Sequence, residues 1–335
     1  MGRRPARRST VPAAIALLAL VLVGCAEPSA PESAPDDAAP STSTDAPAAD
    51  PTDPTEPTEL ETLDEGELGA LADLAEKYAA QSRGNELPED TAGPDRRVFG
   101  ADVGWPQCPP GTGIPEKQGS GQPMPTDAAE FVIIGLTNSP SFTVNPCLES
   151  QLGWVRDRGL MGAAYAVVSY PSRAEVDRHG TTGPYDGGSR LGALRNVGYQ
   201  AARFNVATMA TTGFTSPIVW VDVEPVASFE WSDDPQANAA VVEGTVRGYR
   251  DAGLRVGVYS TPAMWSAIVG GLSFGVPEWR AAGPTSMENA LRRCEEDWSI
   301  QGGPAILGQW VEDNRDRNVT CPGQGVGLGR WFHQY

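Results

Sequence analysis

The chain of 335 residues carries 25 Lys and Arg against 43 Asp and Glu, a formal net charge of -18. So acidic a chain repels the phosphate backbone, and we expect no nucleic acid among its partners. Its length allows more than one domain, but the composition excludes the first quarter of the sequence from any folded core.

Residues 1–24 have the composition of a lipoprotein signal peptide. Four arginines precede the apolar run Val11–Val23, which is too short for a stable membrane span. The ending before Cys25 resembles a bacterial lipobox, so we expect Cys25 to be lipidated and the protein to be extracytoplasmic and anchored to the cell membrane. An ordinary cleaved signal and a twin-arginine export route are the alternatives. Without the leader, the chain has 21 basic and 43 acidic residues, which gives a net charge of -22.

Two segments separate this leader from the folded part. Residues 25–59 consist almost wholly of Pro, Ala, Ser, Thr, Asp and Glu, which predicts a disordered tether. In residues 60–96, leucines recur at helical spacing and predict one amphipathic helix over about 61–81, followed by a linker rich in Gly and Pro. This helix either packs on the folded domain, which we favour, or pairs with a partner.

The cysteines beyond Cys25 number four, an even count that in an exported protein predicts two disulfides. Three connectivities are possible. We favour Cys108 with Cys147 and Cys294 with Cys321, because each pair follows neighbouring predicted strands. No spacing among cysteines and histidines is typical of metal ligands, so we expect no metal and no cofactor.

Residues 97–335 alternate short apolar runs with helical patterns, which predicts an α/β fold with a parallel sheet. Strands are predicted over Val98–Asp102, Phe131–Thr137, Ala163–Ser169, Pro217–Val223, Arg255–Thr261, Glu278–Ala282, Ala305–Trp310 and Arg330–Gln334. Helices are predicted over Pro146–Arg158, Leu191–Ala207, Gln236–Ala252, Ala263–Val269 and Ser286–Glu296. Eight strands favour a (β/α) TIM-like barrel with some outer helices missing. A doubly wound open sheet is the alternative, although no Gly-rich phosphate loop follows the first strand.

The stretch IVWVDVEP ends the predicted fourth strand with two carboxylates. Side chains alternate along a strand, so Asp222 and Glu224 project to one side, with Cβ atoms roughly 6.5 to 7 Å apart. A helix cap or an ion pair at the strand end would also explain them. In a barrel, however, the carboxyl ends of the strands form the active face, and Asp102 closes the first strand on that face.

Aromatic and amide side chains occur near the same strand ends. Aromatic rings pack on the CH faces of sugars, while amides and carboxylates bond their hydroxyls, so this set predicts a glycan site. The predicted substrate-binding residues are Trp105, Tyr165, Tyr259, Trp279, Gln309 and Trp310.

Several motifs follow one another in the folded part, among them GADVGWPQC (100–108), FVIIGLTN (131–138), WVDVEP (220–225), RVGVYST (255–261) and LGQW (307–310). Taken in order, they resemble the glycoside hydrolase family 25 lysozymes, and more closely an uncharacterised actinobacterial lipoprotein branch of that superfamily. The similarity spans about residues 97–335. It implies a flattened β/α barrel that cleaves the β-1,4 bond between N-acetylmuramic acid and N-acetylglucosamine in peptidoglycan.

The resemblance also implies roles for the acids. Glu224 would be the general acid, Asp222 would stabilise positive charge or assist the nucleophile, and Asp102 would orient the sugar or tune the pair. A late aspartate is expected too; Asp313 and Asp316 are candidates, and Asp316 is preferred. Repulsion between close carboxylates would keep one of them protonated.

The chain departs from the family pattern at two places. Gly104 stands where the family has serine in Asp-x-Ser, and Tyr165-Ala166-Val167 stands where a Tyr-His-Phe-like triplet is common. These departures favour a non-catalytic module that binds cell-wall glycan on the same barrel. The three converging carboxylates favour an enzyme, because a pure binder gains little from groups that repel one another. A hydrolase of another exported glycan is the third possibility.

Overall fold

A computed structural model describes residue 93 and residues 95–335. The predicted signal peptide, Cys25, the tether and the helix over 61–81 lie outside the described residues, and the domain boundaries predicted at residues 24, 59 and 96 stay predictions. No helix within the described part of the chain is long and apolar enough to cross a membrane.

The described chain forms a closed barrel of eight strands, in the order β1-β4-β5-β6-β7-β8-β9-β10. Pairing of β5 with β6 and of β10 with β1 closes the ring. All neighbours are parallel except β10, which runs antiparallel to both β9 and β1. The predicted (β/α) barrel is therefore confirmed. Its strands are β1 Phe99–Val103, β4 Phe131–Gly135, β5 Met161–Val167, β6 Ile218–Asp222, β7 Arg255–Ser260, β8 Glu278–Pro284, β9 Ala305–Glu312 and β10 Arg315–Thr320.

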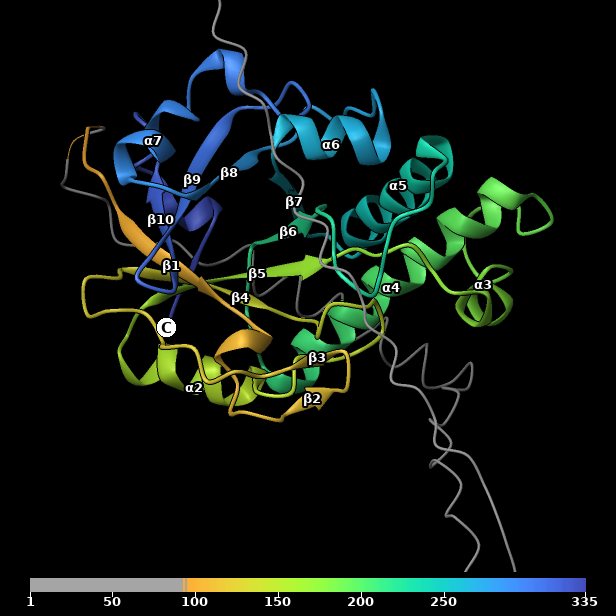
Figure 1. The fold of residues 1–335 in the computed structure, drawn as a ribbon, viewed down its shortest axis with the longest axis horizontal. Helices are drawn as coiled ribbons and strands as arrows, with labels where there is room; N and C mark the ends of the chain where they lie inside the picture. The colour runs from red at the N-terminus through yellow and green to blue at the C-terminus, as the bar shows by residue number, and fades with distance from the viewer. Residues whose placement is uncertain (1–92, 94) are drawn as a thin grey trace, which may run out of the picture. The chain divides into compact units, whose positions relative to one another are not determined.

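Helices surround only part of this barrel (Figure 1). They follow β4, β5, β6, β7 and β8, whereas β1 leads into the small hairpin of β2 (Gly113–Ile114) and β3 (Lys117–Gln118), and β9 leads directly into β10. The sequence predicted that some outer helices are missing, and the structure shows that they are missing after β1 and after β9. The helices are α2 Leu148–Asp157, α3 Arg173–His179, α4 Arg190–Thr212, α5 Pro235–Asp251, α6 Pro262–Val269 and α7 Met287–Arg292. Short 3-10 turns occur at η1 Trp105–Gln107, η2 Glu296–Trp298 and η3 Leu328–Arg330.

The last barrel strand was predicted wrongly. The predicted strand at 330–334 is reduced to β11 (His333–Gln334), which pairs with the start of β5 outside the ring. The eighth barrel strand is β10, whose sequence RDRNVT is largely charged and polar and hides the usual strand signal. Asp313 and Asn314, both at φ 54°, form the two-residue turn that reverses the chain between β9 and β10. The helix α3 was missed as well.

Strand alternation divides the apolar residues of β6 between two cores. One set faces the helices and includes Val219, Val221 and Val223. The other fills the barrel and includes Ile218 and Trp220 from the same strand. Even-numbered residues of β6 therefore point inward, and this parity carries Asp222 to the inner face at the carboxyl end of the strand.

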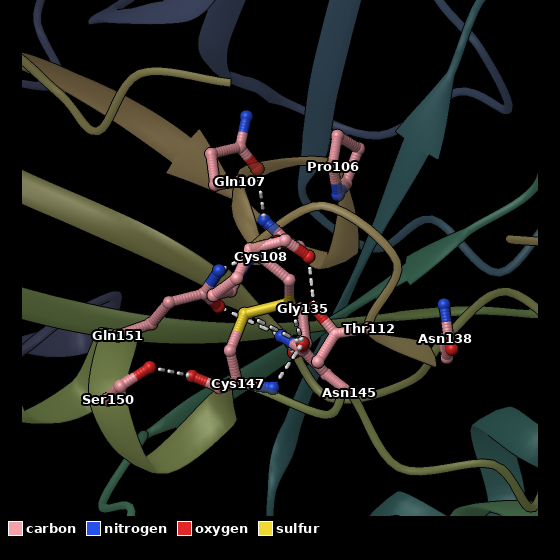
Figure 2. The surroundings of a disulfide bond; sticks show 12 residues. Pro106, Gln107, Cys108, Thr112, Gly135, Asn138, Asn145, Cys147, Ser150 and Gln151 are labelled. Carbon is pink, nitrogen blue, oxygen red and sulfur yellow. Dashed lines mark hydrogen bonds between the residues drawn. A yellow bond between two sulfur atoms is a disulfide. The ribbon is translucent and has the colours of Figure 1, made fainter. Parts of the chain in front are cut away.

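Two disulfides pair Cys108 with Cys147 and Cys294 with Cys321, as predicted. They close loops of 39 and 27 residues. In the loop-entropy account each stabilises the folded state by roughly 4 kcal/mol. Figure 2 shows the first of them, beside Asn145, whose Nδ2 donates to the Gly135 carbonyl at 2.8 Å and to Gln151 at 2.8 Å. Gln151 in turn donates to the Gly104 carbonyl at 2.7 Å, which ties the turn after β1 to α2.

Candidate active site

Four carboxylates line one cavity at the carboxyl ends of the barrel strands, with a volume of about 630 Å³. Asp222 ends β6, and Glu224 lies two residues further on, as the alternation predicted. Asp102 of β1 and Asp316 of β10 are direct cross-strand partners. Partners of this kind have Cβ atoms about 4.5 to 5.5 Å apart, so the two acids share one face of the sheet.

Asp102 is held by two amide side chains. Its carboxylate accepts hydrogen bonds from Asn318 Nδ2 at 2.7 Å and from Gln309 Nε2 at 3.1 Å. Each amide is itself oriented, because Trp279 Nε1 donates to Asn318 at 2.7 Å and the Tyr259 hydroxyl donates to Gln309 at 2.8 Å. Asp102 is therefore a buried acceptor that two oriented amide donors hold in place.

Asp222 differs from Asp102 in its surroundings. It is 3 % exposed, and its Oδ1 has no hydrogen-bond partner among the described residues. A buried carboxylate oxygen without a partner is costly, and Asp222 is one of the residues that line the cavity. This oxygen is thus available to a group that enters the site.

The backbone around Glu224 is fixed by side chains of neighbouring elements. Ser260 Oγ donates to the Val223 carbonyl at 2.7 Å, and Trp231 Nε1 donates to the Glu224 carbonyl at 2.9 Å. Val223 itself is fully buried against the helices. Glu224 is consequently held in place although it lies beyond the end of the strand, and its side chain is only partly buried.

Burial raises the pKa values of all four acids, and repulsion from neighbouring carboxylates adds to the rise for Asp102, Asp222 and Glu224. Burial, then the charge of Asp316, raises the pKa of Glu224 to about 7, and the Lys117 ammonium opposes this rise. Burial, Glu224 and Asp102 raise the pKa of Asp222. Burial raises that of Asp316. Burial and Asp316 also raise the pKa of Asp102, against the lowering effect of its amide donors. Such surroundings favour the protonated forms of these acids, and Glu224, with a pKa of about 7, can hold or release a proton near neutral pH.

The predicted binding residues divide into three groups. Trp105 and Tyr165 line the cavity with partly exposed rings. Tyr259, Trp279 and Gln309 also line it, but they are 9 %, 1 % and 5 % exposed, so they act mainly by holding Asp102. Asp316 lies in the cavity, as predicted.

The prediction for Trp310 was wrong. Trp310 follows Gln309 on β9 and therefore points to the opposite face, where it packs with Ala290 and Val319 outside the barrel. It lines a separate cavity of about 380 Å³ on that outer side.

Three further cavity residues were not predicted from the sequence. Lys117 comes from β3, with its ammonium 5.6 Å from the centre of the Trp105 ring, and Arg293 and Trp298 come from the loop between β8 and β9. Loop residues follow no periodicity that would place them. Asn318, by contrast, had a signal, since it lies two residues from Asp316 on the same strand.

Comparison with known proteins agrees with the motifs. A family profile described as "Lysozyme-like protein 1" matches residues 193–281, a segment that includes Asp222 and Glu224. The "Probable GH family 25 lysozyme 4" of Dictyostelium discoideum is 39 % identical over 66 residues, which cover 19 % of this chain and 30 % of that protein. The chain is thus similar to the lysozyme-like superfamily of glycoside hydrolase family 25, whereas the particular branch stays a prediction.

Solved structures resemble the fold more distantly. A family GH25 lysozyme from Aspergillus fumigatus matches with a TM-score of 0.40 and 16 % identity, over 67 % of this chain and 94 % of that one. A modular autolysin from Streptococcus pneumoniae, solved with a synthetic peptidoglycan ligand, matches with a TM-score of 0.40 and 11 % identity, over 68 % of this chain and 47 % of that one.

Gly104 accommodates Tyr165. A Cβ atom at position 104 would lie 2.5 Å from the Tyr165 hydroxyl oxygen but 3.6 Å from its Cζ. The ring has little room to move, because it also lies over Gly135, where a Cβ would come within 2.8 Å of it. The hydroxyl thus occupies the space that a side chain at position 104 would take.

Gly104→Ala should therefore lower the free energy of unfolding by about 1 to 3 kcal/mol, the usual cost of overpacking. In a Tyr165→Phe background the same change should cost much less, because the clashing oxygen is gone. Urea unfolding of the two single variants and the double variant measures this coupling. An equal cost in both backgrounds would rule out the contact as the reason for glycine.

Proposed function

We propose that this protein is a glycoside hydrolase that cleaves β-1,4 bonds of peptidoglycan glycan in the manner of a muramidase. The observation that carries the proposal is the pairing of Glu224, with a pKa raised to about 7, and Asp222, with an unpartnered carboxylate oxygen, in one cavity. The similarity of residues 193–281 to a lysozyme-like family supports the choice of substrate.

In this mechanism Glu224 gives its proton to the glycosidic oxygen as the bond from that oxygen to the sugar C1 breaks. Positive charge develops on the sugar ring, and the Asp222 carboxylate stabilises it from the cavity wall. Water then adds to C1 and gives a proton to the ionised Glu224, which restores the acid for the next turnover. Asp102 is occupied by its amide donors, so it transfers no proton and acts as a positioning group beside the pair.

Glu224→Gln should lower kcat about 10²- to 10⁴-fold, because glutamine keeps the shape but has no proton of suitable acidity. Asp222→Asn should cost about 10²- to 10³-fold through lost charge stabilisation. The assay is release of reducing ends from insoluble peptidoglycan. Glu230→Gln, on an exposed residue outside the cavity, is the matched control and should leave kcat unchanged. If the wild type binds glycan but releases no reducing ends, the chain is a binding module instead.

The pH dependence should report the proton on Glu224. Its pKa is raised to about 7, so activity should fall as pH rises through about 7 and the acid loses its proton. The Lys117 charge lowers this pKa, so Lys117→Met should raise it and move the falling limb to higher pH. Lys117→Arg keeps the charge and should leave the limb in place. A limb that stays unmoved in Lys117→Met would mean that another group is titrating.

We further propose that the protein acts outside the cytoplasm, held at the membrane by a lipid on Cys25. The lipobox-like ending before Cys25 supports this, and the acidic segment 25–59 would give the barrel reach into the wall. Cys25→Ser should release the protein from the membrane fraction or block its maturation, as fractionation and mass spectrometry of the N-terminus would measure. Membrane retention without any lipid on the mature N-terminus would contradict the anchor.

A further inference from the structure

The cavity contains a cation that the proposed mechanism does not use. Of its two basic residues, Lys117 acts on the pKa of Glu224, whereas Arg293 has no part in holding or tuning the acids described above. A neutral sugar can be bound by neutral hydrogen-bonding groups and an aromatic face without the charge of a guanidinium. Arg293 therefore calls for a separate explanation.

Arg293 and Trp298 form one stacked pair on the cavity wall. The guanidinium carbon lies 3.6 Å from the centre of the Trp298 ring, within the range of a cation–π contact. Arg293 Nε and Trp298 Nε1 are both buried, and neither has a hydrogen-bond partner among the described residues. Two neighbouring donors without acceptors favour a ligand that brings acceptor oxygens.

The charge of Arg293 is also uncompensated. Arg317 provides the contrast: its Nε lacks a hydrogen-bond partner as well, but Glu312 and Asp313 lie 3.2 and 3.3 Å from its guanidinium. Arg293 forms no ion pair within residues 95–335. An anion is thus the acceptor that matches both its charge and its free donor.

A buried ion pair between Glu278 and Arg280 holds the loop that carries Arg293 and Trp298. Glu278 and Arg280 alternate on β8 and contact each other at 2.7 Å, with 0 % and 2 % of their surface exposed. Arg280 Nη1 donates to the carbonyls of Arg293 and Glu295 at 2.8 and 2.6 Å. Glu278 accepts from the backbone N–H groups after Trp298, those of residues 300, 301 and 303.

The loop is therefore fixed on both sides of Trp298, and the disulfide of the neighbouring Cys294 fixes it further. Rigid support of this kind lowers the entropy that a binding group loses when it engages a ligand. The positions of the two donors are set before a ligand arrives.

We propose that Arg293 and Trp298 form a subsite for a carboxylate carried by the glycan. The carboxylate accepts from the guanidinium and the indole N–H together, and it belongs either to a sugar unit or to a peptide attached to that unit. This inference rests on the proposed function in taking the ligand to be the glycan whose bond Glu224 protonates. It adds that the cleft selects for acidic units and discriminates against neutral glycans such as chitin fragments.

Equilibrium binding tests the subsite apart from catalysis. The full chain with Glu224→Gln is titrated with three soluble glycans: peptide-free strands with free muramic acid carboxylates, the same strands after reduction of those carboxylates, and peptide-bearing strands. We expect about 10-fold tighter binding of the acidic strands than of the reduced ones, the effect of one charged hydrogen bond. Arg293→Gln should abolish this preference and leave binding of the reduced strands within about 2-fold of its starting value.

The exposed neighbour Arg292 supplies the matched control. Arg292→Gln should keep the preference for acidic strands. Arg293→Lys keeps the positive charge but loses the planar guanidinium, so it should keep part of the preference. This second variant tests the subsite if Arg293→Gln does not fold. A preference confined to peptide-bearing strands would assign the carboxylate to the peptide. Equal binding of all three glycans, or a preference that survives Arg293→Gln, would overturn the subsite. Either result stands whether or not the wild type releases reducing ends, so failure of the subsite and failure of the proposed hydrolase are separate outcomes.

Discussion

The burial of several carboxylates at one end of a barrel is the constraint on which the site depends. Each acid taken out of water favours its neutral form, and each neighbour of like charge strengthens that tendency. The protein offsets this cost at Asp102 but not at Asp222. Asp102 receives donors from Gln309 and Asn318, whereas Asp222 keeps an oxygen without a partner. One position is thus stabilised as part of the scaffold and the other is left available for chemistry.

This division depends on aromatic residues that were expected to contact sugar. Trp279 and Tyr259 are almost completely buried, and each donates one hydrogen bond to an amide that in turn bonds Asp102. Their rings also pack against each other, with centroids 4.4 Å apart. The barrel core and the acid network are therefore one structure, and a loss of packing at Trp279 would also release Asn318 and change the field around Asp102.

The sequence predicted the features whose signals lie within a few consecutive residues and missed those that depend on long-range contacts. Asp222 and Glu224 were predictable because strand alternation and the apolar run around them are properties of eight consecutive residues. The same rule, applied strictly, excludes Trp310 once Gln309 faces inward. Strand β10 was not predictable from its charged sequence, although the Asp313-Asn314 turn gave a hairpin signal. Arg293 and Trp298 depend on Arg280 and a disulfide, which are long-range contacts that no short window of sequence reveals.

The negative net charge of the chain does not by itself exclude an acidic substrate. The net charge is -18, but nine of the acids lie in residues 26–59, apart from the barrel residues in sequence. Fields from exposed charges fade over a Debye length of about 8 Å at physiological ionic strength. Groups within the cavity are screened much less, so its own carboxylates together with Lys117 and Arg293 govern what enters it. In the proposed function, a guanidinium in the same cavity as the carboxylates would offer an anionic polymer one point of attachment, and it would also set the position of the polymer along the cleft relative to Glu224.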